Sequence, residues 1–139
     1  MINFIEHIGI AVKSIEEANL IYERLLGKAP YKQEWVESEQ VKTSFFKQGN
    51  NKIELLEAAS PESAIAKFIE KKGEGIHHIA FDVDNIIEEM NRLKELGFQL
   101  INEKPKKGAD NKWVCFIHPK SANGVLIELC QQIQGDECL

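Results

Sequence analysis

The chain has 139 residues, of which 43% are hydrophobic and 28% are charged, which is the composition of an ordinary globular protein. Its formal net charge of −5 argues against a general role in binding nucleic acid. The three cysteines, Cys115, Cys130 and Cys138, form no CxxC pair, and the N-terminal stretch MINFIEHIGIAV has neither a basic region nor a long apolar segment. We therefore expect a cytoplasmic protein without a disulfide framework, signal peptide or membrane span.

The first half of the chain predicts a strand, a helix and a hairpin. IEHIGIAV is short, apolar and partly alternating, which is typical of a strand. Ser14, with Glu17 three residues later, forms a capping box for a helix that ends at Gly27. QVKTSFFKQ and NKIELLEA, joined around Gly49, indicate a β-hairpin. The apolar residues expected to bury one face of the helix are Ile15, Ala18, Ile21, Tyr22 and Leu25.

The second half repeats this plan after a linking helix. SPESAIAKFIEKKG predicts that helix, with Ser60 as its N-cap and Gly73 after its end. HHIAFDV then predicts a strand, and Asn85 opens a helix that stops at Gly97. WVCFIHP and GVLIELCQQ predict the later strands.

The two halves are similar enough in sequence to indicate a duplication. HIGIAVKSIEEANLIYERLLG corresponds to HIAFDVDNIIEEMNRLKELG, and KIELLE corresponds to LIELC further along each copy. A βαββ module of this size would bury too little apolar surface alone. We therefore expect an α+β protein with one domain over residues 1–139. Module one would span about 1–59, the linking helix about 60–72 and module two about 73–132, with a curved sheet around a cleft.

The duplication places four potential metal ligands at equivalent positions. His7 and His78 come from the first strand of each copy, and Glu54 and Glu128 come from a later strand. Two imidazoles and two carboxylates suit a divalent ion such as Zn, Co, Ni or Fe and leave positions for water or substrate. No local motif such as HExxH is present, so the repetition itself carries this prediction.

Each of these residues also has a structural interpretation. A glutamate in the apolar run KIELLE can face solvent from a half-exposed strand, which would leave Ile53 and Leu55 as the core residues. The equivalence of two such glutamates and two histidines favours the metal site over this interpretation. Glu57 falls on the face opposite Glu54, and we expect it to be solvated. His77 should point away from the face of His78 and pack against a neighbour.

At this point the sequence resembles the vicinal oxygen chelate superfamily, which includes glyoxalase I and methylmalonyl-CoA epimerase. GEGIHHIAFDVD and HPKSANGVLIEL are similar to the epimerase family in particular. The resemblance implies two tandem βαβββ modules, a divalent metal in the cleft (Co or Zn, with Ni, Mn or Fe as further options) and a homodimer. It places His7, His78 and Glu128 on metal-ligand positions and Glu54 on a fourth position.

The resemblance also implies a reaction, which is epimerisation of methylmalonyl-CoA at C2 by proton abstraction through a metal-stabilised enolate. Glu128 is the first candidate for the general base. In some relatives a second acid/base is a Glu after an EQGV motif, but SEQVKTSFF places Thr43 there. Three explanations stay open: Glu54 takes the role, a shifted register brings in Glu37 or Glu39, or the activity differs.

The coenzyme A portion of such a substrate carries phosphates, which an acidic protein must contact through local basic groups. Lys120 and Ser121 lie in the HPKS stretch that the family shares and are candidate substrate contacts, together with Thr43. The lysines clustered in the second half are Lys104, Lys106, Lys107, Lys112 and Lys120, and exposed lysines are most often simply solvated.

Three other functions compete with the epimerase. A glyoxalase I-type lyase acting on a thiol hemithioacetal would suit the same ligand set, but HPKSANGV favours the epimerase. A non-catalytic small-molecule binding protein of this fold would not need four metal ligands. A ring-cleaving iron dioxygenase could use two histidines and one glutamate, but the epimerase-like motifs fit it poorly.

Overall fold

The computed structural model describes residues 1–139 and contains three α-helices and eight β-strands. It divides into two compact units. The N-terminal unit is His7–His77, and the C-terminal unit is Met1–Glu6 together with His78–Leu139. Strand β1 (Ile2–Ala11) crosses from the C-terminal to the N-terminal unit at His7, and strand β5 (Gly75–Val83) crosses back at His78. Both histidines are therefore the first residues after a crossing.

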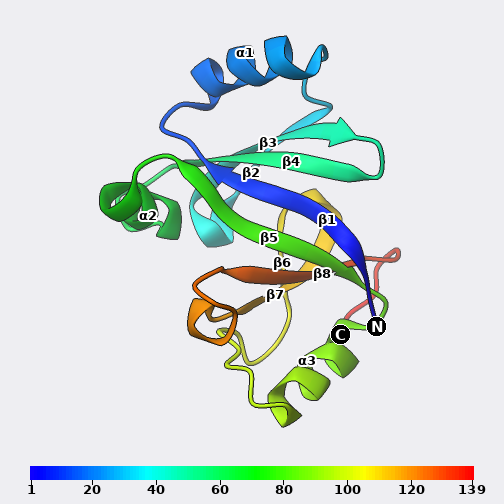
Figure 1. Cartoon of the computed structure of the whole chain (residues 1–139). Coiled ribbons are helices and arrows are strands. Elements are labelled where there is room, and N and C mark those ends of the chain that lie inside the picture. The colour runs from blue at the N-terminus through cyan, green and yellow to red at the C-terminus, as the bar shows by residue number, and fades with distance from the viewer. The chain divides into compact units, whose positions relative to one another are not determined.

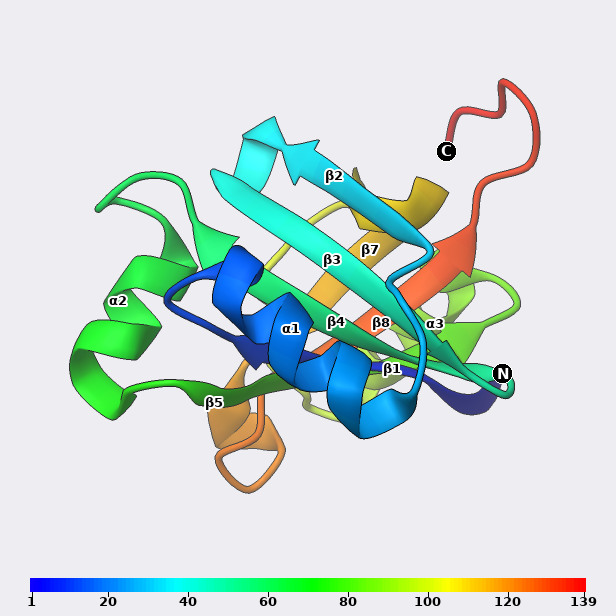
Figure 2. The same cartoon turned by 90° about the horizontal axis from the view of Figure 1, so that it is seen from above.

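The N-terminal unit is a βαβββ module followed by a helix (Figure 1). After β1 its elements are α1 (Ile15–Leu26), β2 (Lys32–Val36), β3 (Val41–Gln48), β4 (Asn51–Ala58) and α2 (Ala64–Lys72). The strand order is β2-β3-β4-β1. Strand β3 is antiparallel to β2 and β4, whereas β1 is parallel to β4. Figure 2 shows α1 lying across the face of β3 and β4.

Helix α1 forms where the capping signals predict it. The Ser14 hydroxyl accepts a hydrogen bond from the Glu17 amide at 3.2 Å, and Gly27 ends the helix at a φ of 75°. The prediction that Ile21 and Leu25 are core residues is wrong, because they are 53% and 70% exposed. The helix instead packs along a narrower stripe beside them. The hydrophobic core between α1 and the sheet contains Val12, Ile15, Ala18, Phe46 and Leu55, with Tyr22 and Leu26 packed against it.

The N-cap of helix α2 (Ala64–Lys72) lies three residues later than predicted. Ser63, not Ser60, caps the helix, because its hydroxyl accepts from the Ala66 amide at 3.1 Å. The Ser60 carbonyl instead accepts from the Ser63 amide at 3.2 Å, so the segment between them is a turn. The predicted hairpin of β3 and β4 is confirmed, and Gly49 supplies its positive φ of 61°.

The C-terminal unit contains the second βαβββ module. After β5 its elements are α3 (Ile86–Glu95), β6 (Lys106–Lys107), β7 (Lys112–Ile117) and β8 (Ile127–Gln132). Strand β5 is parallel to β8, and β7 is antiparallel to β8 and β6. The Asn85 side chain caps α3, accepting from the Glu88 amide at 3.1 Å, as the sequence predicts. The core against α3 contains Val83, Ile86, Met90, Leu93, Trp113, Cys115, Ile117, Leu129 and Ile133.

The predicted fold class is confirmed, since the chain is α+β and each module reads βαβββ. Each module has a mixed sheet with one helix against one face. None of the helices combines the length and apolarity needed to span a membrane.

Candidate metal centre and active site

In the N-terminal unit, the sheet face opposite α1 brings His7 and Glu54 together. Leu55 packs in the core against α1, so Glu54 points to the other face. Strands β1 and β4 pair Gly9 with Glu54, and His7, two residues before Gly9, shares that face. The Nε2 atom of His7 lies 3.3 Å from Oε1 of Glu54, and these side chains are only 6% and 5% exposed. The alternative of a solvated Glu54 is therefore wrong.

In the C-terminal unit, the same register brings His78 and Glu128 together. Strands β5 and β8 pair Ala80 with Glu128, and His78 again lies two residues earlier. Its Nε2 atom is 3.3 Å from Oε1 of Glu128, and both side chains are almost fully buried. Phe116, which lies opposite Glu128 on β7, contacts the His78 ring edge to face at a centroid distance of 5.9 Å. Each unit thus holds one buried imidazole against one buried carboxylate.

The donor chemistry of each pair fits a divalent transition metal. Neutral imidazole nitrogen and carboxylate oxygen are ligands that Zn, Co, Ni and Fe accept. Two ligands each about 2.1 Å from one ion and at right angles to each other would lie about 3 Å apart. The 3.3 Å spacing within each pair is close to that value. The residues present can therefore hold such an ion with little movement.

The structure separates the two adjacent histidines as the sequence predicts. The His77 ring contacts the Phe68 ring of α2 edge to face, at a centroid distance of 5.0 Å and an interplanar angle of 84°. This contact lies within the N-terminal unit, whereas His78 faces Glu128 within the C-terminal unit. The prediction that His77 packs against a neighbour is therefore confirmed.

Thr43 lies on the Glu54 face of the N-terminal sheet. The hydroxyl of its neighbour Ser44 donates to Asn19 of α1 at 2.7 Å, so Thr43 points away from α1. Thr43 is buried, and its hydroxyl donates to the Glu34 carbonyl at 3.1 Å. Because that proton is engaged, the hydroxyl keeps only its acceptor lone pairs for a substrate.

The other acidic candidates near Thr43 lie outside the strand. Glu37 and Glu39 form a short 3-10 helix (Glu37–Glu39) before β3 begins. Gln40 follows it in the left-handed conformation, with a φ of 54° and a ψ of 48°. A shifted register of β3 therefore finds no support in this structure, since the residues concerned are not part of the strand.

The lysines of the second half differ in their surroundings. Lys112 is only 7% exposed, so the expectation of a solvated side chain is wrong for this residue. Its position on β7 places it on the buried sheet face opposite α3. There its ammonium group donates to Gln132 Oε1 at 2.9 Å and lies 3.8 Å from Glu6 Oε2. Lys106 lies over the Phe116 ring, with Nζ 5.9 Å from the centroid.

The two proposed substrate contacts of the HPKS stretch lie in a short 3-10 helix (Pro119–Ser121). Lys120 is exposed, and its amide donates to Nδ1 of His118 at 3.0 Å. The Ser121 hydroxyl accepts from the Gln99 amide at 2.9 Å. It can still donate a hydrogen bond to a ligand.

Sequence reasoning missed Glu6 as a residue of interest. Its carboxylate is buried, pairs with Lys112 and lies within 4.8 Å of the Cys130 sulfur. The signal was present, because Glu6 is a charged residue inside an apolar strand and immediately precedes His7. In the alignment of the two copies it corresponds to His77.

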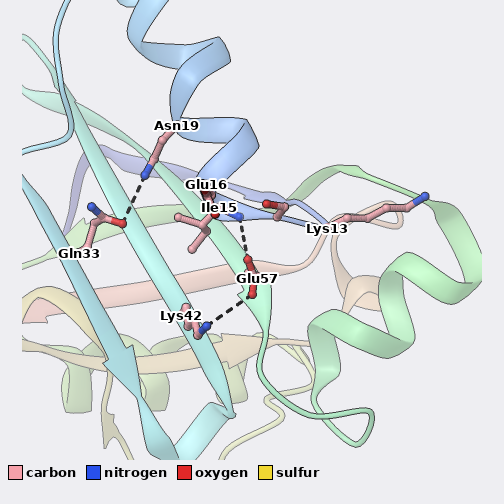
Figure 3. A pocket seen from close by; sticks show the side chains of 8 residues that line it. Lys13, Ile15, Glu16, Asn19, Gln33, Lys42 and Glu57 are labelled. Atoms are coloured by element: carbon pink, nitrogen blue, oxygen red, sulfur yellow. Dashed lines mark hydrogen bonds and ion pairs between the residues drawn. The ribbon is translucent and has the colours of Figure 1, made fainter.

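A polar hollow lies on the other face of the N-terminal sheet, at the start of α1 (Figure 3). Glu57 accepts from the Ile15 amide at 2.7 Å and lies 3.8 Å from the Lys42 ammonium group. Asn19 donates to Gln33 at 3.3 Å (Figure 3). The prediction that Glu57 lies opposite Glu54 is confirmed, but the expectation that it is merely solvated is wrong. Because Glu57 and Glu54 point to opposite faces of the sheet, the hollow is separate from Glu54 and His7.

The comparison with known families identifies the class of protein to which this fold of two βαβββ modules belongs. Residues 6–116 match the model of the glyoxalase/bleomycin resistance protein/dioxygenase superfamily. The chain belongs to this superfamily.

Individual proteins similar to this chain include an uncharacterized protein and two epimerases. The uncharacterized protein YqjC of Bacillus subtilis is 44% identical over 135 residues, which are 97% of this chain and 96% of that protein. The ethylmalonyl-CoA/methylmalonyl-CoA epimerase of Cereibacter sphaeroides is 40% identical over 133 residues, which are 94% of this chain and 99% of that enzyme. A variant of Streptomyces coelicolor methylmalonyl-CoA epimerase, solved in complex with 2-nitronate-propionyl-CoA, has a TM-score of 0.91 and 27% identity and covers 96% of this chain and 100% of that chain.

Proposed function

We propose that this protein is a metal-dependent epimerase that interconverts the C2 epimers of methylmalonyl-CoA. The observation that carries the proposal is the pair of equivalent, buried His–Glu contacts, one in each module, in a chain whose relatives include epimerases of alkylmalonyl-CoA esters. The same relatives favour an epimerase over a glyoxalase I-type lyase or a non-catalytic binding protein.

The proposed ligands are His7, Glu54, His78 and Glu128, which together would hold one divalent ion, cobalt or zinc in the first instance. The two modules would then act as a single domain, because each supplies two of the four donors. When bound, the ion supplies a Lewis acid that lowers the pKa of the C2–H bond of a chelated thioester.

Glu128 is the proposed general base that removes the proton from C2. Glu54 is the proposed second acid/base, which returns a proton to the opposite face of C2 and so inverts the centre. The surroundings of Thr43 support this choice, because its hydroxyl proton is engaged by a backbone carbonyl and an alcohol is a weak base. Glu37 and Glu39 lie outside β3, which also favours Glu54.

The proposed substrate is an acyl-CoA ester. Support comes from the Streptomyces coelicolor epimerase, which was solved in complex with a propionyl-CoA derivative. Thr43 would contact the acyl portion, since it shares a sheet face with Glu54. Lys120 and Ser121 would contact the coenzyme A portion, since Lys120 is exposed and Ser121 retains a donor. We also propose a homodimer, as the resemblance implies.

Deuterium exchange tests the proposal. The protein, loaded with cobalt or zinc, is incubated with methylmalonyl-CoA in heavy water, and deuterium at C2 is followed by mass spectrometry. We expect exchange well above that of the chelator-treated protein. Equal exchange in both samples would disprove the proposal, and turnover of a hemithioacetal in its place would assign the protein to the lyases.

A further inference from the structure

The residue before each candidate histidine ligand is anchored in the unit that the chain is leaving. Glu6 is the last residue of the C-terminal unit before His7, and His77 is the last residue of the N-terminal unit before His78. The two positions correspond in the duplication but carry different side chains. Each makes a specific contact inside its own unit, so the strand backbone immediately before each histidine is held by a side chain.

The anchor before His7 is a polar cluster in which Glu6 and Lys112 are buried and Gln132 is exposed. Lys112 lies directly opposite Gln132 in the register of β7 and β8, and its Nζ donates to Gln132 Oε1 at 2.9 Å. The same ammonium group lies 3.8 Å from the Glu6 carboxylate. The side chains of Lys112 and Glu6 are 8% and 6% exposed, so this ion pair is almost fully removed from water.

The anchor before His78 is aromatic. The His77 ring and the Phe68 ring of α2 are in edge-to-face contact. The Lys72 ammonium group lies 5.8 Å from the centroid of the same Phe68 ring. The His77 side chain is thus held by α2, while the next side chain along β5 faces Glu128.

General energetics give no strong reason to regard the Glu6–Lys112 pair as a stabilising contact. Removing two charges from water costs about as much as their attraction returns, so a buried ion pair is weak evidence of a stabilising contact. Groups that orient metal ligands are a different case, because replacing them typically weakens metal binding by about 10–100-fold. The residue that precedes a ligand in the sequence can act in this way, because a fixed side chain at that position also fixes the backbone from which the ligand side chain extends.

We propose that Glu6, through Lys112 and Gln132, and His77, through Phe68, are positioning residues for His7 and His78. They hold the strand backbone immediately before each histidine, and this limits the orientations that the imidazole can take toward a metal ion. This inference rests on the proposed metal site and adds to it five side chains that are not among the proposed ligands.

Metal affinity measured apart from turnover tests the inference. The double variant Glu6→Gln/Lys112→Met removes both buried charges, so no unpaired charge is left to unfold the chain. Dissociation constants for Co²⁺ come from calorimetry, and the visible absorption of bound Co²⁺ reports its coordination geometry. We expect binding at least about 10-fold weaker than wild type and an altered spectrum. Lys112→Arg, which keeps the charge, should retain most of the affinity.

Two further variants separate positioning from ligation and from general stability. His77→Ala should weaken Co²⁺ binding, whereas His77→Phe, which keeps a ring against Phe68, should not. Glu89→Gln is the matched control, since Glu89 is a buried carboxylate of the C-terminal unit that pairs with Arg92. It should lower the melting temperature of the metal-free protein and leave the Co²⁺ dissociation constant unchanged.

The outcomes distinguish this inference from the proposed function. If the wild-type protein binds no Co²⁺, both are wrong. If the wild type binds Co²⁺ and the double variant binds it equally well with the same spectrum, the positioning role alone is wrong. Loss of affinity in His77→Phe equal to that in His77→Ala would likewise overturn the aromatic anchor and indicate that the imidazole itself is required.

Discussion

The amide of Ile15 donates a 2.7 Å hydrogen bond to the carboxylate of Glu57, and this bond ties the first turn of α1 to strand β4. The second module has the same bond, since the Ile86 amide of α3 donates to Gln131 of β8 at 2.8 Å. In both modules the acceptor lies three residues after the glutamate that faces the histidine. A strand residue on the helix-facing side thus satisfies an amide that the helix itself leaves unpaired.

Replacing Glu57 with Ala should destabilise the N-terminal unit. The Ile15 amide would lose a charged acceptor, at a cost of roughly 1.5–3 kcal/mol in the free energy of unfolding. Glu57→Gln should cost less than about 1 kcal/mol, because Gln131 shows that an amide oxygen can fill this position. Urea unfolding of the two variants measures the difference. Equal losses would mean that the charge, through its weak pairing with Lys42, matters more than the acceptor.

Replacing Gln40 with Gly should stabilise the protein. Gln40 has a positive φ of 54°, a conformation that costs a non-glycine residue roughly 1–2 kcal/mol. Glycine would lose the hydrogen bond from Gln40 Nε2 to the Glu37 carbonyl and would pay more backbone entropy, so we expect a net gain below about 1 kcal/mol. Thermal unfolding measures the change, and a lower melting temperature for Gln40→Gly would contradict the strain argument.

Local sequence signals were sufficient for most of the fold, because the caps and turns act over a few residues. Ser14, Asn85 and Gly49 all do what their residue types predict. The wrong predictions concern residues whose burial or capping role depends on how the whole helix packs and where it starts. Ile21 fits helical spacing, yet the sheet contacts only a narrow stripe of α1. Ser60 is a reasonable cap, yet the chain uses Ser63 after one further turn.

The pairs within the candidate site were accessible from sequence because the duplication fixes equivalent positions. A period of two along each strand also separates His77 from His78 without further information. The pairing of Lys112 with the buried Glu6 could not be predicted from sequence, because it depends on which strands lie side by side in the folded chain. From its residue type a lysine is expected to be exposed, and only the folded structure shows that Lys112 is 7% exposed and lies opposite Gln132.

The stability of the C-terminal unit should depend on pH through Glu89. The side-chain hydrogen bond from Arg92, aided by the amino group of Met1, holds the pKa of Glu89 below its usual value of 4.5. A lowered folded-state pKa adds stability above the unfolded-state pKa, and this stability is lost as pH falls through the folded-state pKa. The difference in unfolding free energy between wild type and Glu89→Gln should therefore be largest at neutral pH and shrink below about pH 4.5. A constant difference from pH 7 to pH 3 would contradict this.

Only Cys138 should react with thiol reagents in the native protein. Burial raises the pKa of the Cys115 thiol to about 11, and Cys130 is also buried, whereas Cys138 is exposed. Because the thiolate is the reactive form, alkylation at pH 8 should label Cys138 within minutes and leave the other two unmodified. Peptide mass spectrometry identifies the labelled site. The denatured protein, labelled at all three, is the control, and native labelling of Cys115 would show that its strand opens readily.

Single substitutions of the two proposed acid/bases should separate exchange from inversion. In a two-base mechanism each carboxylate serves one face of C2, so a variant that keeps one base can still remove and return a proton on that face. With Glu54→Gln, we expect one epimer of methylmalonyl-CoA to exchange its C2 proton with heavy water while inversion falls by about 100-fold or more. Glu128→Gln should show the complementary preference or no exchange at all. Because both residues are also proposed ligands, the metal content of each variant is measured first, and the assay is run at saturating Co²⁺. If Glu54→Gln, fully loaded with metal, inverts at the wild-type rate, then Glu54 is not the second acid/base.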